Sequence, residues 1–245
     1  MTAVSNYLAG VVYIGTRALL LLLSVLLAAC SGDSTVSELS EENIVANNRG
    51  VALMGRFDYQ GASEVFAQLV EHQPDWHAVR INYAIALKNR QQEDDGQRAL
   101  EQLKTVLSAQ PDNLRANYNA GVLQLYQGNI ESSISHFEAA LALDFNDAYT
   151  HYYLGQCQLR VGDETAALAS YQQAIQLDPY LRSAYYSAAQ ILRRLGRVEE
   201  ASEQLSLFQR FERNPSARLA EFKYTRMGPK SLAIVIGNSN SLTEK

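Results

Sequence analysis

Residues 148–181 read AYTHYYLGQCQLRVGDETAALASYQQAIQLDPYL, and this stretch decides the fold. Two runs that favour helix flank a turn at Gly162, and a proline follows the second run. Glycine and proline commonly mark the ends of helices. Small side chains at Gly155 and Ala167 let the two helices cross closely, and Tyr171 fills the space one turn later. The stretch therefore predicts an antiparallel helical hairpin.

The same pattern recurs along the chain. Small residues of the first helices stand at Gly50, Ala84, Gly121, Gly155 and Ala189, spaced by 34, 37, 34 and 34 residues. Those of the second helices stand at Ala62, Ala99, Ser133, Ala167 and Ala201, each followed four residues later by a bulky apolar residue. Because a lone hairpin cannot bury its apolar face, this period predicts a stack of hairpins.

The single irregular interval lies in the second repeat. It places three extra residues in the polar stretch 89–96, between two predicted helices, where loops tolerate insertions at small entropic cost. The acidic run Glu93, Asp94 and Asp95 within it is interpreted as a solvated charge run.

These residues resemble the tetratricopeptide repeat family. Its pattern W-x2-L-G-x2-Y, A-x3-F and P appears here as His151-x2-Leu154-Gly155-x2-Gln158, Ala167-x3-Tyr171 and Pro179. The resemblance covers about 170 residues and implies an all-α, right-handed α-solenoid of five hairpins. The repeats span 43–76, 77–113, 114–147, 148–181 and 182–215.

Residues 216–245 follow the last repeat. Residues 216–226 have Leu219 and Phe222 on one helical face, which predicts a capping helix over the last hairpin. Residues 232–236 resemble a strand, and a lone strand is not stable by itself. Two interpretations stay open: this stretch lies on the solenoid or is disordered, or it opens a β domain.

The first helices of this family line a ligand groove, and the resemblance predicts which residues face it. The predicted protein- or peptide-binding residues are Asn82, Arg115, Tyr118, Asn119, Tyr126, Tyr149, Tyr152, Tyr153, Arg160, Tyr186, Gln190, Arg193 and Arg194. Tyrosine and arginine commonly anchor interfaces. The alternative for Tyr118, Tyr152 and Tyr186 is packing between adjacent first helices. The second repeat also offers Lys88 on this face.

Asparagine recurs at one repeat position, as Asn48, Asn82 and Asn119. An amide there can hydrogen-bond the backbone of an extended peptide, although a solvated helix face gives the same pattern. The family's clamp for a C-terminal carboxylate is matched only at Asn82 and Arg115, two places of five. An acidic or carboxylate-bearing peptide remains one candidate partner.

The N-terminus carries a second pattern. Residues 18–29 read ALLLLLSVLLAA after Arg17, a length typical of a secretory signal core and too short to span a bilayer as a helix. The run ends at Cys30 and resembles the lipobox of bacterial lipoproteins, which implies a cleaved signal at 1–29 and acylation of Cys30. Residues 30–42 would form a tether of roughly 17–21 Å. The alternative is an uncleaved anchor over residues 7–29.

In bacterial lipoproteins the residue after the acylated cysteine affects sorting. Ser31 favours the outer membrane, facing the periplasm, over the inner membrane. Acylation would leave Cys157 without a disulfide partner, and its place in a repeat predicts a buried thiol.

Composition and motifs argue against catalysis and nucleic-acid binding. The net charge is -5, whereas nucleic-acid binders usually show a basic surplus. The four histidines fall at unrelated repeat positions, and no phosphate loop or nucleophile motif is present. The sequence predicts no enzyme, cofactor or metal, and instead a membrane-anchored scaffold for proteins or peptides in the bacterial envelope. Two alternatives are an interaction module of a larger exported protein and a self-assembling array.

Overall fold

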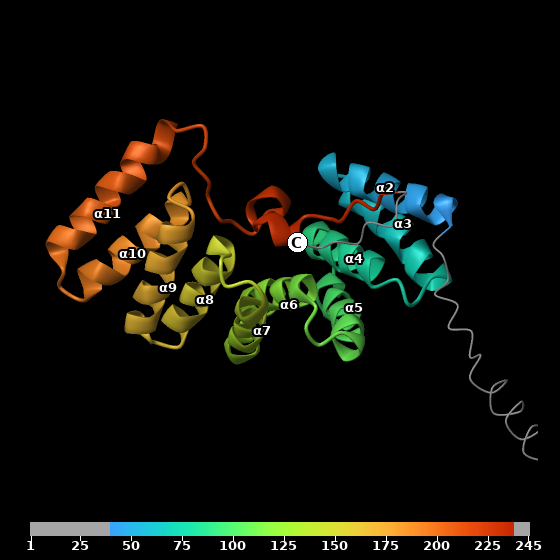
Figure 1. Cartoon of the computed structure of the whole chain (residues 1–245), viewed down its shortest axis with the longest axis horizontal. Helices are drawn as coiled ribbons and strands as arrows, with labels where there is room; N and C mark the ends of the chain where they lie inside the picture. Colours follow the sequence, from blue (N-terminus) through green and yellow to red (C-terminus); the bar gives the residue numbers. More distant parts are fainter. Residues whose placement is uncertain (1–39, 238–245) are drawn as a thin grey trace, which may run out of the picture. The chain divides into compact units, whose positions relative to one another are not determined.

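A computed structural model describes residues 40–237, and within this range ten α-helices pair into consecutive antiparallel hairpins (Figure 1). The helices are α2 Glu41–Gly55, α3 Tyr59–His72, α4 His77–Arg90, α5 Asp95–Ala109, α6 Leu114–Gln127, α7 Ile130–Leu143, α8 Ala148–Arg160, α9 Glu164–Leu177, α10 Arg182–Arg194 and α11 Val198–Arg210. The predicted all-α fold of stacked hairpins is confirmed. The first helices, α2, α4, α6, α8 and α10, start at or within two residues of the predicted repeat starts.

Residues 1–39 lie outside the described part of the chain, and so do 238–245. The predicted signal at 1–29, Cys30 and most of the tether therefore stay predictions. No helix in residues 40–237 is long and apolar enough to cross a membrane.

In three of the five hairpins an aromatic ring of the second helix covers a glycine of the first helix, as in Gly155 under Tyr171. A Cβ atom built on Gly50 would stand 2.5 Å from the Phe66 ring. The same test gives 2.8 Å between Gly121 and Phe137. Such distances leave no room for a side chain, so the small residues of the repeat pattern set how closely the helices cross.

Polar caps and glycine turns fix the ends of the helices. The carboxylates of Asp147 and Asp163 accept hydrogen bonds from the first backbone N–H groups of α8 and α9, which otherwise lack partners. Gly128, at the turn between α6 and α7, has φ +85°, a conformation that suits glycine.

The insertion in the second repeat forms the turn 91–94 between α4 and α5. One part of the sequence interpretation is wrong, because Asp95 is not solvated: only 1% of its surface is exposed. Arg90 donates to both of its carboxylate oxygens, at 2.5 and 2.9 Å, and holds the pKa of Asp95 below its usual value against the opposing effect of burial. The acidic residue therefore closes the enlarged turn.

Residues 216–226 do not form the predicted capping helix. They run as an extended connector, with a single 3-10 turn η2 at Tyr224–Arg226. The backbone of Arg218 pairs instead with the loop before α10: its N–H donates to Tyr180 O, and its carbonyl accepts from Arg182 N, both at 2.8 Å. These contacts use backbone groups that a helix would have paired internally.

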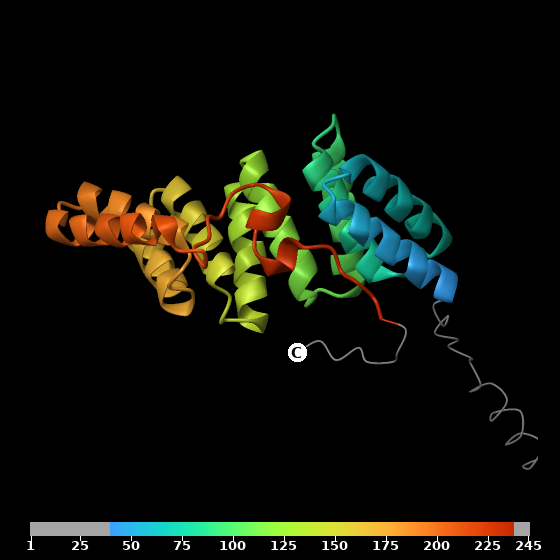
Figure 2. The same ribbon diagram turned by 90° about the horizontal axis from the view of Figure 1, so that it is seen from above.

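The connector leads into residues 227–236, which we call the tail segment. It contains the 3-10 turn η3 at Pro229–Ser231 and is otherwise extended. Figure 2 shows it crossing from α8 past α6 toward α2, over the first helices. Of the two interpretations open for residues 232–236, lying on the solenoid is the one that the structure shows.

Candidate functional site

The surface formed by the first helices α2, α4, α6 and α8, here called the first-helix surface, holds the tail segment through side-chain contacts to its backbone. Asn48 Nδ2 donates to Ile236 O at 2.7 Å, and Asn48 Oδ1 accepts from Ile236 N at 2.9 Å. One repeat further on, Asn82 Nδ2 donates to Ile234 O at 3.0 Å and its Oδ1 accepts from Ile234 N at 2.6 Å. Each asparagine amide thus both donates to and accepts from the backbone of one residue of the tail segment. The two residues are two positions apart, as expected when they point to the same side of an extended chain.

The second of these contacts is reinforced by α2. Asn47 Nδ2 also donates to Ile234 O at 3.0 Å, and its Oδ1 accepts from Asn82 Nδ2 at 2.9 Å. Asn47 and Asn82 are both fully buried. Burial without partners would be costly for an amide, so these side chains are held in place by the peptide that they bind.

A polar cluster on α4 and α6 holds the middle of the tail segment. Asn119 Nδ2 donates to Lys230 O at 2.9 Å, and its Oδ1 accepts from Ser231 Oγ at 2.9 Å. Lys88 Nζ donates to Asn119 Oδ1 at 2.8 Å and to Ser231 Oγ at 3.0 Å. Arg115 donates to the carbonyl of Leu232.

Lys88 is 3% exposed and sits among neutral acceptors. Burial, and to a smaller extent the charge of Arg115, lowers the pKa of Lys88 to about 7. The floor of the site therefore carries an ammonium group that is only weakly stabilised in its charged form.

The N-terminal end of the tail segment contacts an acidic pair and Tyr118. Lys230 Nζ lies 2.7 Å from Asp144 Oδ2 and 3.0 Å from Asp147 Oδ2. The hydrogen bond from Lys230 lowers the pKa of the Asp144 carboxyl. Tyr118 donates its hydroxyl hydrogen to Met227 O, and burial raises the pKa of this phenol well above its usual value.

The connector adds aromatic contacts on either side. The ring of Phe222 packs on Tyr126 with centroids 3.8 Å apart, and Tyr224 packs edge-on against Tyr59 at 6.1 Å. The hydroxyl of Tyr224 accepts from Ala233 N at 3.0 Å, which ties the connector to the tail segment.

The predicted groove residues divide into two groups. Those against the C-terminal segment are Asn82, Arg115, Tyr118, Asn119, Tyr126 and Tyr149. Asparagines at the repeated position do bond the backbone of an extended peptide, which here is part of the same chain.

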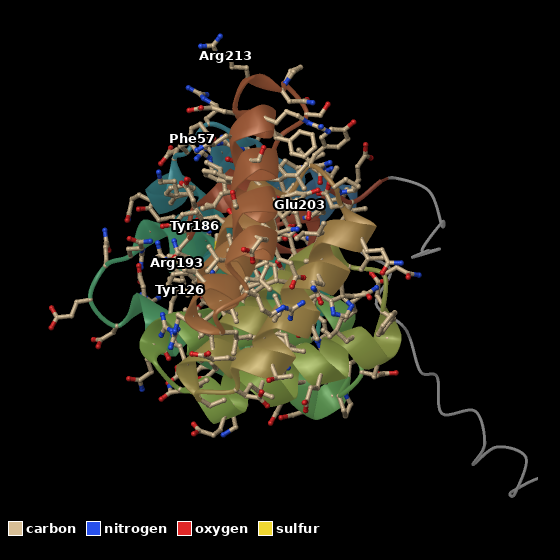
Figure 3. The ribbon with its side chains drawn as sticks, turned by 90° about the vertical axis from the view of Figure 1, so that its left-hand side faces the viewer. Phe57, Tyr126, Tyr186, Arg193, Glu203 and Arg213 are labelled. Atoms are coloured by element: carbon tan, nitrogen blue, oxygen red, sulfur yellow. The ribbon has the colours of Figure 1, made fainter. Side chains whose placement is uncertain are left out.

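The remaining residues make other contacts. Tyr152 and Tyr153 are buried, and Tyr153 stacks on Phe137 at 5.9 Å, so packing explains both. Arg160 donates to Leu125 O, and Arg194 pairs with Glu164. Tyr186, Gln190 and Arg193 lie on α10: Tyr186 is 47% exposed and packs on Phe208, and Arg193 donates to Gln190. Figure 3 views this end of the molecule, with Tyr186 and Arg193 beside α11.

Sequence reasoning missed the acidic pair Asp144 and Asp147. They lie at the junction of α7 and α8, outside the helical stripe used to select groove residues. Their position in the sequence, in the loop that leads into α8, was the only feature that could have predicted them, since such a loop borders the first-helix surface. Within residues 40–237 no group of three or more His, Cys, Asp or Glu side chains is arranged to hold a metal.

Comparison with known proteins agrees with this architecture. Residues 118–182 match the family model described as tetratricopeptide repeat, and residues 52–144 match one described as TT21 fifth ARM repeats domain. No curated protein matches the sequence. These findings support a tetratricopeptide repeat within residues 118–182.

Similar solved structures include MamA and PilF. MamA, residues 41 to the end, from Desulfovibrio magneticus RS-1 has 21% identity and a TM-score of 0.65, over 73% of this chain and 99% of that chain. PilF of Pseudomonas aeruginosa has 17% identity and a TM-score of 0.63, over 70% of this chain and 77% of that chain. At these identities the likeness concerns the fold.

Proposed function

We propose that the first-helix surface binds an extended segment of a partner protein and that the chain is a protein-binding scaffold. One observation carries the proposal: Asn48 and Asn82 each make a two-way hydrogen bond with one backbone residue of the tail segment. Main-chain recognition of this kind holds any extended polypeptide, and the surrounding side chains add specificity. The tail segment then acts as a built-in occupant of the partner's site.

A covalently attached occupant competes strongly, because its effective concentration is on the order of millimolar for short flexible links. The test therefore needs the full chain with a loosened tail. The double variant Ile234→Pro, Ile236→Pro, here called the loosened chain, removes the two N–H groups that donate to Asn82 and Asn48. Val235→Pro is the matched control, because it leaves both of those donors in place.

The probe is a fluorescent peptide with the sequence of residues 226–237, and its anisotropy is measured with each full-length protein in mild detergent. We expect the loosened chain to bind the peptide at least tenfold more tightly than the Val235→Pro control. Asn82→Ala in the loosened chain should weaken binding by about 1–2 kcal/mol. If the loosened chain keeps its helical circular dichroism and still does not bind, the proposed function is wrong.

We also propose that the scaffold is anchored to a bacterial membrane through acylated Cys30, on the periplasmic face of the outer membrane. The support is the sequence ALLLLLSVLLAA at 18–29, directly followed by Cys30 and then Ser31. Labelled palmitate should be incorporated into the wild type and into Cys157→Ala, whose thiol is buried in α8. It should be lost in Cys30→Ala, together with membrane fractionation. Unchanged labelling of Cys30→Ala would contradict the anchor.

A further inference from the structure

The charges beneath the tail segment are unevenly matched. The ammonium of Lys230 lies opposite two carboxylates, Asp144 and Asp147, at 2.7 and 3.0 Å. The next residue, Ser231, is fully buried and presents a neutral hydroxyl to Lys88 at 3.0 Å. The tail segment thus places a positive charge, Lys230, against the acidic pair Asp144 and Asp147. Against the basic Lys88 it places only the neutral hydroxyl of Ser231.

Lys88 has no carboxylate partner among the described ion pairs of residues 40–237. Asp95 borders the same hollow of about 190 Å³ as Lys88, but Arg90 binds its carboxylate at 2.5 Å. A buried ammonium that has only neutral acceptors carries a desolvation cost that a carboxylate would offset. Lys88 therefore has an unused capacity for a charge-assisted hydrogen bond.

The hollow provides the second observation. Lys88, Tyr126 and Phe222 all border it, so the connector's own aromatic ring forms one wall. Lys88 is thus buried yet borders open volume, whereas Ser231 is not among the residues that line this hollow.

Building on the proposed function, we infer that the first-helix surface selects partner segments with a basic residue at the place of Lys230 followed directly by an acidic residue at the place of Ser231. The acidic side chain bonds Lys88, and the basic one bonds Asp144 and Asp147. The native tail, with serine at this place, is the weaker occupant and gives way to such a partner.

The test uses the full-length loosened chain and three versions of the labelled peptide 226–237, with Ser, Asn or Asp at the place of Ser231. Asn and Asp have the same shape, so their comparison isolates the charge. At pH 6 the Asp peptide should bind roughly tenfold or more tightly than the Asn peptide. Adding Lys88→Met should remove this preference, whereas Lys104→Met, a change of an exposed lysine on α5, should leave it.

A second measurement covers the case in which Lys88→Met misfolds. In the otherwise native chain, Ser231→Asp should unfold at a higher temperature than Ser231→Asn at pH 6. Equal affinities for the Asn and Asp peptides, or a preference that survives Lys88→Met, would overturn the inference and leave the proposed function standing. Failure of all three peptides to bind the folded chain would overturn both.

Discussion

Lys88 is the residue whose protonation should respond most to folding at neutral pH. Its pKa in the folded chain is about 7, below the ordinary 10.5 of an exposed lysine. Between these values the unfolded chain binds the extra proton and the folded chain does not, so the free energy of unfolding should rise with pH. Below pH 7 both states are charged, and the cost of burying the ammonium is at its maximum, on the order of a few kcal/mol.

Urea unfolding of the wild type and Lys88→Met between pH 6 and about 9.5 measures this effect. We expect the wild type to gain stability relative to Lys88→Met across this range. Lys88 donates to the neutral groups of Asn119 and Ser231, and the charge of Arg115 acts on it. Asp95, which borders the same hollow, is paired with Arg90. The buried tyrosines have raised pKa values and do not titrate there. Parallel stability curves for the two proteins would contradict the prediction.

Gly228 is a second single residue on which the bound tail depends. Its φ is +86°, and a Cβ atom there would stand 2.7 Å from Tyr149 Cγ and 2.8 Å from Tyr118 Oη. Gly228→Ala should therefore release the tail segment, at a cost of about 1–3 kcal/mol. Gly237→Ala is the matched control, since its Cβ would meet nothing within 4 Å. Hydrogen exchange of residues 232–236 should accelerate in the first variant only, and equal rates in both would refute the prediction.

At the scale of the element, the sequence predicts what is local and misses what is distant. The spacing of Gly121 and Phe137 predicts a hairpin because each hairpin closes on its own residues. Residues 216–226 have helical periodicity, but tertiary contacts override such a weak preference. The partners of this connector, such as Tyr180 for Arg218 and Tyr126 for Phe222, lie in other repeats of the chain, and no local pattern encodes them.

The same limit applies to the candidate site. The repeat position of Asn48, Asn82 and Asn119 predicts that they bond an extended peptide, because one helical face repeats in every hairpin. That the peptide is the chain's own tail rests on contacts across 188 residues for Asn48 and 152 for Asn82. Asp95 shows the limit on a smaller scale: its burial depends on Arg90, five residues earlier, at the end of α4.

The last hairpin should be the least stable element of the helical stack. Without the predicted capping helix, Ala201 is the only buried residue of α11, and Val198 is 58% exposed. End repeats have one neighbour instead of two, so their stability depends on a cap. Hydrogen exchange should be faster in α11 than in α6 to α9, which supply most residues of the main apolar cluster, whereas α11 supplies only Ala201. Equal protection would show that the connector stabilises this end as a helix would.

At the scale of the whole molecule, the tail segment couples the two ends of the helical stack. The connector is fixed beside α10 by Arg218, and the tail segment ends against α2 at Asn48 (Figure 1). A ligand on the first-helix surface therefore has to break contacts in several repeats together. The proposed function therefore implies two distinct states of the chain, one with the tail segment on the first-helix surface and one with a ligand there and the tail segment released.

This coupling predicts how the chain responds to a partner. Adding the Asp version of the peptide 226–237 to the native full chain should accelerate exchange of the amides of Ile234 and Ile236, because Asn82 and Asn48 transfer their bonds to the incoming backbone. Amides inside α6 and α8 should keep their protection, since the helices stay folded. The Asn version at the same concentration serves as the control and should act more weakly. If the peptide binds while both isoleucine amides stay protected, it occupies another surface, and the tail segment is a permanent part of the fold that no partner displaces.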